Sequence, residues 1–381
     1  MHPERGKRER VKIAIHVGSR IWGGAERASA RLAAGLQARG HEVRLFCNQH
    51  EHVARAGELG LRAVIAPLHG DVALHTALAF AARLRGYRPD VLIVGTYKKL
   101  WLAGLAARLA RVPRVVARVG LDSDVPRNRK YQFALRHLVS TVVVNSRAQA
   151  APFLALPGRD AHRVRVIYNY YEPRPHGSPD RIRRELGLTR ELPVVGAVAR
   201  LATQKRLERL LDAVALLPGV HCVLAGDGPR APELHAHAAV RDITGRVHFL
   251  GHRDDIPDVL ALLDVFVICS DREGMSNAML EALAAGVPVV STPVSGATDA
   301  LEPLADGTSP GTIAGPQPEA IAAAVGRILA DHELRASMKR AAATRIAERF
   351  APESVLCAWE QVLAEPRAAS RAPSGSAPSV S

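Results

Sequence analysis

Short runs of consecutive apolar residues alternate along this chain with longer segments in which apolar residues recur every three or four positions. The first apolar run covers residues 11–17, a segment with helical spacing follows at 25–39, and a second apolar run covers 43–47. Runs that are apolar at nearly every position are typical of strands buried on both faces of a parallel sheet. The alternation therefore predicts an α/β fold, with helices on both sides of parallel sheets.

The alternation occurs twice, and a proline-rich segment separates the two sets. Residues 172–180 contain three prolines, which is typical of a linker. Before this segment we expect further strands near residues 61–66, 91–94, 115–119 and 142–144. After it we expect strands near residues 194–199, 222–225, 247–250, 265–268 and 287–290. The pattern predicts two Rossmann-like, doubly wound domains that face a central cleft, where ligands meet the carboxyl ends of the strands.

The expected domains have defined limits. Residues 1–173 form the first domain and residues 180–348 the second. Residues 350–364 have the spacing of an amphipathic helix, which we expect to pack back towards the first domain. The tail at 366–381 is rich in Pro, Ser and Ala and is expected to be disordered.

The composition is that of a globular protein, with 48% apolar and 23% charged residues. No apolar run approaches the roughly 18–20 residues that span a bilayer, and the charged N-terminus lacks the apolar stretch of a signal peptide. The four cysteines lie far apart, which indicates reduced thiols rather than disulfides or a metal site. We therefore expect a cytoplasmic protein that can associate with the cytoplasmic face of a membrane.

The charge is distributed unevenly between the two halves of the chain. Residues 1–172 carry 29 Lys and Arg against 12 Asp and Glu, a net charge of +17, whereas the remainder carries a net charge of −3. A basic domain favours phosphates, nucleic acid, an anionic membrane or an acidic substrate. No aromatic RNA-binding pattern or DNA-binding motif accompanies the charge, so nucleic acid is not an expected partner.

Gly23 and Gly24 lie between the first expected strand and the first expected helix. Glycines at this position let backbone N–H groups approach a phosphate or a sugar. The spacing is not that of the GxGxxG dinucleotide fingerprint, which disfavours NAD. A plain turn between strand and helix explains the same residues equally well.

Two cations, Arg200 and Lys205, follow the first expected strand of the second domain. Both are expected to point into the cleft, where two fixed positive charges can neutralise a departing nucleoside diphosphate. Considered alone, such a pair is also typical of an ordinary solvated loop.

The most informative segment covers residues 270–290. Glu273 lies in a loop after a strand, and Glu281 follows eight positions later inside a helix whose N-cap is Ser276 or Asn277. The free backbone amides of such a helix N-terminus offer a site for a diphosphate. The two carboxylates can accept hydrogen bonds from sugar and ribose hydroxyls.

Together these residues resemble glycosyltransferase family 4, a family of retaining enzymes with the GT-B fold. The resemblance rests on segments that follow the family's order over nearly the whole chain before the tail: 23–26, 40–43, 144–146, 166–169, 200 with 205, 226–229, 249–251 and 273–290. It implies that the second domain binds a nucleotide sugar. The first domain then binds the acceptor.

The resemblance also implies a role for each candidate residue. Arg200 and Lys205 hold the diphosphate, Glu273 contacts the donor sugar, and Glu281 holds the ribose. Further donor contacts are expected from Gly24, Gly251, His252, Gly274, Met275, Ser276 and Asn277. Among these, the backbone around Gly251 and His252 flanks the base, and Gly24 approaches the donor phosphate or the acceptor from the first domain.

The chain departs from the family's pattern at one position. Many relatives carry a histidine just after the strand expected near residues 115–119, whereas this chain has Arg118. Arg118 is expected on the acceptor side, where it can replace that histidine or bind an anionic acceptor.

The mechanism that the resemblance implies is a front-face displacement with retention, in which the leaving diphosphate oxygen takes the acceptor proton. A covalent intermediate on a carboxylate is the alternative. No metal or other cofactor is expected. Asp122, Ser123 and Asp124 match a metal-binding pattern of a different glycosyltransferase fold, but a solvated loop is the simpler interpretation.

Basic residues in the middle of the first domain are expected to form one face that docks on an anionic membrane or a phosphorylated lipid-linked acceptor. These residues, with one tryptophan, are Lys98, Lys99, Trp101, Arg111, Arg114, Arg118, Arg127, Arg129 and Lys130. An arginine-rich surface without a partner is the alternative.

The predicted function is transfer of a sugar to a cell-envelope glycan or lipid-linked acceptor, as in lipopolysaccharide, exopolysaccharide or glycolipid biosynthesis. Two alternatives remain open at this point. One is a GT-B-shaped sugar-nucleotide epimerase, and the other is a non-catalytic protein that binds a sugar nucleotide or a polyanion.

Overall fold

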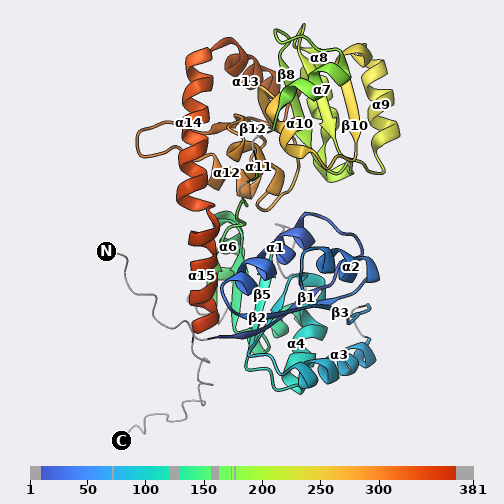
Figure 1. The fold of residues 1–381 in the computed structure, drawn as a ribbon, viewed down its shortest axis with the longest axis vertical. Coiled ribbons are helices and arrows are strands. Elements are labelled where there is room, and N and C mark those ends of the chain that lie inside the picture. The colour runs from blue at the N-terminus through green and yellow to red at the C-terminus, as the bar shows by residue number, and fades with distance from the viewer. Residues whose placement is uncertain are drawn as a thin grey trace, which may run out of the picture.

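The computed structural model describes residues 10–70, 73–120, 129–155, 163–172, 174–175 and 177–365. The tail predicted at 366–381 and the Asp122–Asp124 pattern lie outside the described residues, as does part of the proline-rich segment. The described chain forms two α/β domains, one above the other in Figure 1. All of the strand pairings are parallel, which confirms the predicted fold class.

The first domain is built on a seven-stranded sheet with the order β3-β2-β1-β4-β5-β6-β7. Its strands are β1 (Lys12–Val17), β2 (Glu42–Cys47), β3 (Ala63–Ile65), β4 (Val91–Val94), β5 (Arg114–Val119), β6 (Thr141–Val144) and β7 (Val164–Val166). The strand order reverses at β1, which pairs with both β2 and β4. In open α/β sheets this reversal creates the crevice where ligands bind.

Helices cover both faces of the first sheet. One face packs against α1 (Gly24–Ala38), α2 (His50–Glu58) and α15 (Pro352–Ala364), the last helix of the described residues. The other face packs against α3 (Leu74–Tyr87), α4 (Leu100–Leu109), α5 (Arg129–His137) and α6 (Arg147–Leu154). A short 3₁₀ turn, η1 (Tyr97–Lys99), precedes α4.

The second domain is built on a six-stranded sheet with the order β10-β9-β8-β11-β12-β13. Its strands are β8 (Val194–Val198), β9 (His221–Ala225), β10 (Val247–Gly251), β11 (Val265–Ile268), β12 (Val289–Ser291) and β13 (Gly311–Ile313). The order reverses at β8, which pairs with β9 and β11. The loops that follow β8 and β11 carry the predicted cations and carboxylates.

Helices also cover both faces of the second sheet. One face packs against α8 (Leu207–Ala215), α9 (Ala231–Val240) and α13 (Pro318–Ala330). The other packs against α7 (Pro179–Leu186), α10 (Ile256–Leu262), α11 (Asn277–Ala284) and α12 (Ser295–Ala300), and α14 (His332–Arg349) contributes to both. Two 3₁₀ turns, η4 (Thr203–Lys205) and η5 (Thr244–Arg246), complete the domain.

The chain returns to the first domain at α15. Helix α14 ends at Arg349, with Phe350 as its C-cap. Pro352 then begins α15, because proline is tolerated in the first turn of a helix but not in its interior. Trp359 of α15 is 2% exposed in the core of the first domain. Arg39 at the end of α1 forms ion pairs with Glu353 and Glu360, which fixes α15 against α1 (Figure 1).

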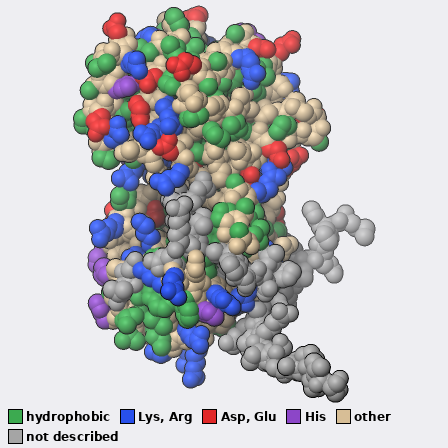
Figure 2. All heavy atoms as spheres, turned by 180° about the vertical axis from the view of Figure 1, so that it is seen from behind, with side chains coloured by type: hydrophobic (Ala, Val, Ile, Leu, Met, Phe, Trp, Pro, Cys, Tyr) green, Lys and Arg blue, Asp and Glu red, His purple; other side chains and the backbone are tan. Residues whose placement is uncertain are grey.

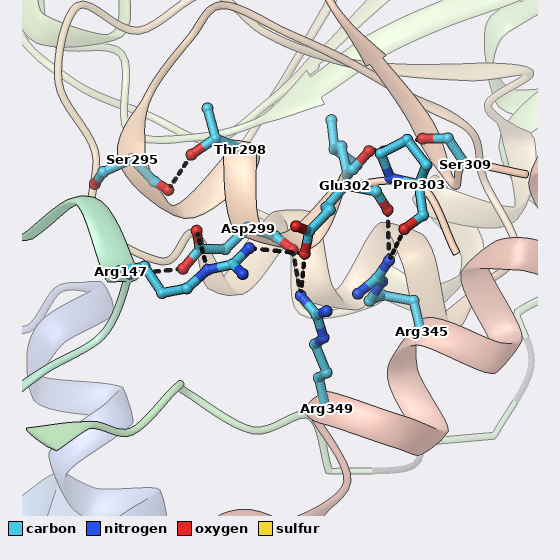
Figure 3. Close-up of polar contacts among 10 residues, drawn as sticks. Arg147, Ser295, Thr298, Asp299, Glu302, Pro303, Ser309, Arg345 and Arg349 are labelled. Carbon is cyan, nitrogen blue, oxygen red and sulfur yellow. Dashed lines mark hydrogen bonds and ion pairs between the residues drawn. The ribbon is translucent and has the colours of Figure 1, made fainter. Parts of the chain in front are cut away.

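Ion pairs also join the two domains at the N-terminus of α6 (Figure 3). The backbone N–H of Arg147 donates to the buried carboxylate of Asp299 at 2.7 Å, and its guanidinium lies 2.7 Å from Glu302. Arg349 of α14 contacts the same oxygen of Glu302 at 2.7 Å. The two arginines hold the pKa of Glu302 at about 2, well below its ordinary value.

Candidate functional site

The loops after β1, β8 and β11 lie at the carboxyl ends of their strands and face each other between the domains. The side-chain N–H of Asn277, the first residue of α11, donates to the carbonyl of Gly24 at 2.9 Å. This bond joins the glycine loop of the first domain to the motif segment of the second. The structure thus brings together two candidate segments that lie 253 positions apart along the chain.

Lys205 and Glu273 form an ion pair inside this region. The Lys205 ammonium at the end of η4 contacts Oε1 of Glu273, and the Ser270 hydroxyl donates to the same oxygen at 2.8 Å. The side chains of Lys205 and Glu273 are 18% and 11% exposed, so the solvent screens this ion pair only partly. The Ser295 hydroxyl donates to the backbone carbonyl of Glu273 at 2.8 Å, which stabilises the loop that carries Glu273.

Arg200 follows β8 and is exposed. Across the described part of the chain, no side-chain hydrogen bond or ion pair engages its guanidinium. A ligand with negative charge can therefore contact Arg200 without breaking an existing pair. Lys205, by contrast, must share its charge between Glu273 and any ligand.

The helix N-terminus predicted in the motif segment is present at α11. Ser276 is the N-cap, and its hydroxyl accepts from the Met279 N–H at 3.4 Å. A Cβ at Gly274 would lie 2.0 Å from the carbonyl oxygen of Gly120, so only glycine allows this loop to approach the first domain so closely. Met275 is 5% exposed in the core of the second domain, which leaves only its backbone for contact with a donor.

Glu281, the predicted ribose ligand, is paired across the two domains. Arg31 of α1 donates to Oε1 of Glu281 at 2.8 Å, and each side chain is 14% exposed. The role of Arg31 is not evident from the sequence, because a single arginine inside an amphipathic helix carries no signal that it faces another domain.

Gly251 and His252 lie at the end of β10. Gly251 has a φ of +63°, a conformation that favours glycine, and its carbonyl accepts from Gly226 at 2.7 Å. The side chain of His252 is 64% exposed and lies 3.5 Å from Asp254. Both residues therefore form an accessible rim next to β9.

Arg118 lies beneath α1, at the end of β5. Its guanidinium donates to the Ser29 hydroxyl at 3.1 Å and to the side-chain oxygen of Asn169 at 2.8 Å. Burial lowers the pKa of Arg118 to about 10, while the charge of Glu26 opposes the shift. Arg118 lines a small pocket together with Arg31, Asn169, Tyr170, Asn277 and Trp359.

The predicted basic face is only partly correct. Arg114 is 8% exposed, and its guanidinium donates to the carbonyls of Val362 and Leu363 at the end of α15, at 3.0 and 2.6 Å. Arg114 and Arg118 thus lie on the α1 and α15 side of the sheet, because alternate residues of β5 point to this face. Arg127 lies outside the described residues.

The helices α3, α4 and α5, with the turns that adjoin them, carry both exposed basic and exposed apolar side chains. Lys98, Arg111 and Arg129 are exposed. Leu74 and Leu78 of α3, Leu109 of α4 and Phe133 of α5 are 54%, 59%, 37% and 48% exposed. Figure 2 shows hydrophobic side chains gathered on the lower, N-terminal half of the molecule, with Lys and Arg around them. We call this surface the α3–α5 face.

The described residues lack two features that would bear on the site. Within them, no helix is both long enough and apolar enough to cross a membrane. The described side chains also contain no group of three or more His, Cys, Asp or Glu arranged to hold a metal ion.

Most of the chain matches two known protein families. Residues 22–173 match the family described as Glycosyltransferase Family 4, and residues 178–345 match Glycosyl transferases group 1. The two matches meet at the proline-rich segment. They confirm the resemblance that was inferred from the sequence motifs.

Curated relatives include the lipopolysaccharide core biosynthesis glycosyltransferase LpsE of Rhizobium meliloti, 34% identical over 53% of this chain and 58% of LpsE. Another is the N-acetyl-alpha-D-glucosaminyl L-malate synthase of Bacillus anthracis, 26% identical over 64% of each chain. The chain thus spans about six-tenths of the length of these two relatives.

Solved structures include Alr3699/HepE of Anabaena in complex with UDP-glucose. It superimposes with a TM-score of 0.80 over 93% of this chain and 99% of that one, at 23% identity. The superposition confirms the GT-B arrangement of the two domains.

Proposed function

Because this chain belongs to glycosyltransferase family 4, we propose that it transfers a sugar from a nucleoside-diphosphate sugar to a cell-envelope glycan or a lipid-linked acceptor. The observation that carries the proposal is the placement of Lys205 and Glu273 beside the N-terminus of α11, with Arg200 exposed at the neighbouring strand end. LpsE, which acts in lipopolysaccharide core biosynthesis, and HepE, which binds UDP-glucose, support this substrate class.

The donor diphosphate is proposed to lie between Arg200, Lys205 and the first amides of α11. Three sources of positive potential then converge on one pyrophosphate, because a helix N-terminus carries about half a unit charge. Glu273 accepts from a donor-sugar hydroxyl, and Glu281 accepts from the ribose. Gly251 and His252 border the base.

The proposed reaction retains the anomeric configuration. The bond between the anomeric carbon and the diphosphate oxygen breaks, and the acceptor oxygen bonds to the same face of that carbon. The acceptor proton passes to the departing diphosphate oxygen, so charge and atoms balance. Arg200 and Lys205 stabilise the negative charge that develops on this leaving group. We propose that these two side chains supply that stabilisation in place of a bound metal ion.

The acceptor is proposed to reach the site from a membrane surface contacted by the α3–α5 face. Exposed aromatic and aliphatic side chains surrounded by Lys and Arg suit an anionic bilayer, where apolar groups enter the interface and cations pair with headgroups. We propose that the protein acts in the cytoplasm at the cytoplasmic face of the membrane.

The test is incubation of the protein with a panel of nucleotide sugars and a membrane extract that supplies acceptors. Release of nucleoside diphosphate with a new α-linked product from an α-linked donor, identified by NMR, is the expected result. A new sugar nucleotide without diphosphate release would instead indicate an epimerase. Tight binding without any turnover would indicate a non-catalytic binding protein.

A further inference from the structure

A buried asparagine, Asn169, connects the two domains directly behind the N-terminus of α11. It follows β7 in the segment that crosses from the first domain to the second, and it is 8% exposed. Its side-chain N–H₂ donates to the Met275 carbonyl at 3.0 Å and to Oδ1 of Asn277 at 3.1 Å. Its side-chain oxygen accepts from Arg118 at 2.8 Å.

These partners determine how the amide of Asn169 is oriented. Arg118 can only donate and the Met275 carbonyl can only accept, so the oxygen of Asn169 must face Arg118 and the nitrogen must face the loop. The partners of Asn277 orient its amide in the same way, because its side-chain oxygen accepts from Asn169 and its side-chain nitrogen donates to the Gly24 carbonyl.

The bonds continue until they close a ring. Arg118 donates to the Ser29 hydroxyl at 3.1 Å, and that hydroxyl donates to the Ala25 carbonyl at 3.0 Å. Ala25 lies next to Gly24, which the amide of Asn277 contacts. The first turn of α1, the end of β5, the crossover segment and the start of α11 are therefore linked by one hydrogen-bond network.

Arg118 is charged but binds neutral acceptors in this network. Among the hydrogen bonds of the described residues, those of its guanidinium go to a hydroxyl and an amide oxygen, not to a carboxylate. The amide oxygen of Asn169 is thus one of the two acceptors that hydrogen-bond this partly buried cation among the described residues, while the carboxylate of Glu26 adds a favourable charge. Loss of this acceptor leaves Arg118 poorly solvated, which is costly for a charged group.

We infer that Asn169 is a positioning residue for donor binding, held in place by Arg118, and that it fixes the loop at residues 274–277 so that the amides of α11 meet the donor diphosphate. The inference rests on the proposed function, because it assumes that the diphosphate binds at this helix N-terminus. It assigns Arg118 to orienting the donor site through Asn169.

Two substitutions separate positioning from simple stabilisation. Asn169→Ala removes all three hydrogen bonds. Asn169→Asp is close in shape and still accepts from Arg118, but it cannot donate to Met275 or to Asn277. Asn48→Ala is the matched control, because Asn48 also makes three hydrogen bonds but only inside the first domain, to the backbone of Gly18 and Leu68.

The experiment measures binding of UDP, GDP and ADP by calorimetry, together with the melting temperature of each variant. We expect both Asn169 variants to bind the preferred nucleotide about tenfold more weakly, corresponding to loss of one or two hydrogen bonds at the site. Asn169→Asp should melt closer to the wild-type protein than Asn169→Ala does. Asn48→Ala should lower the melting temperature without changing nucleotide affinity.

Wild-type affinity in both Asn169 variants, with or without a lower melting temperature, would overturn the inference and leave the proposed function intact. Failure of the wild-type protein to bind any of the three nucleotides would overturn the proposed function and the inference with it. The aspartate variant keeps the test decisive if the alanine variant does not fold.

Discussion

Arg31 on α1 donates a hydrogen bond of 2.8 Å to Glu281 on α11, so the carboxylate expected to bind the donor ribose is already held by a cation of the opposite domain. Both side chains are 14% exposed, which keeps the pair in a region of weak screening. Arg31 leaves one oxygen of Glu281 for a hydroxyl and fixes the orientation of the carboxylate.

We expect Arg31→Ala to weaken binding of UDP about tenfold, because a charged hydrogen bond that orients Glu281 is lost. Binding of inorganic pyrophosphate, which has no ribose, should not change. Calorimetric titrations with the two ligands provide the comparison. Equal weakening for both ligands would show that Arg31 acts on the diphosphate rather than on the ribose carboxylate.

Lys205→Ala should reduce the turnover number by roughly 10²–10³, the usual cost of removing one group that stabilises a developing negative charge. Lys205→Arg keeps the charge and should retain more activity. The control is Arg190→Ala, which removes an 80% exposed cation of the same domain. The rate of nucleoside diphosphate release measures the effect, and a decrease of less than threefold for Lys205→Ala would argue against the proposed leaving-group role.

The stability of the first domain should depend on pH through His16. This side chain is fully buried on β1, and burial lowers its pKa from 6.5 to about 4. The unfolded chain therefore binds a proton more readily than the folded one. The contribution of neutral His16 to the free energy of unfolding is therefore fully present above about pH 6.5 and is lost as the pH falls towards 4. At 1.36 kcal/mol per pKa unit, the loss amounts to about 3 kcal/mol.

Denaturant unfolding at pH 7 and at pH 4.5 tests this dependence. The His16→Gln variant cannot titrate at this position, so its free energy of unfolding should fall less between the two pH values. Burial lowers the pKa of His52 in the same direction, and this contribution remains in both proteins. An identical decrease for wild type and variant would exclude His16 as the source.

The α3–α5 face should bind vesicles that contain anionic lipid. The double variant Arg129→Glu with Arg136→Glu reverses two charges of α5 and should weaken vesicle binding at least tenfold. The reason is that each basic residue near an anionic surface contributes about 1 kcal/mol to the binding free energy. Arg190→Glu with Arg241→Glu changes the charge equally on the second domain and should have little effect. Co-sedimentation is the measurement, and equal pelleting with neutral and anionic vesicles would remove the membrane proposal.

Buried strands could be predicted from the sequence because each is apolar at almost every position. The strands β4 (VLIV) and β11 (VFVI) are fully buried and lie where the apolar runs predict them. The edge strands β7 and β13 were not predicted. Each has three residues, and their sequences, VRV and GTI, contain a polar residue or glycine where an edge strand meets solvent.

The candidate site was predictable only where the chemistry is concentrated in one segment. Glu273, Ser276 and Glu281 lie within nine residues, so their relation to one helix could be read from spacing. Arg31 and Asn169 could not be assigned a role in this way, because their partners lie 250 and about 106 positions away along the chain. Contacts between domains depend on how two sheets are placed, which local periodicity does not encode.

The course of α15 has a consequence for biosynthesis. Val355, Trp359 and Val362 of this helix complete the core beneath α1, yet they are translated after the entire second domain. Until α15 has been synthesised, an apolar surface on one side of the first sheet remains uncovered. The packing of this side of the sheet therefore becomes possible only after α15 has emerged from the exit tunnel, and a premature stop codon near residue 350 would damage the half of the molecule that was synthesised first.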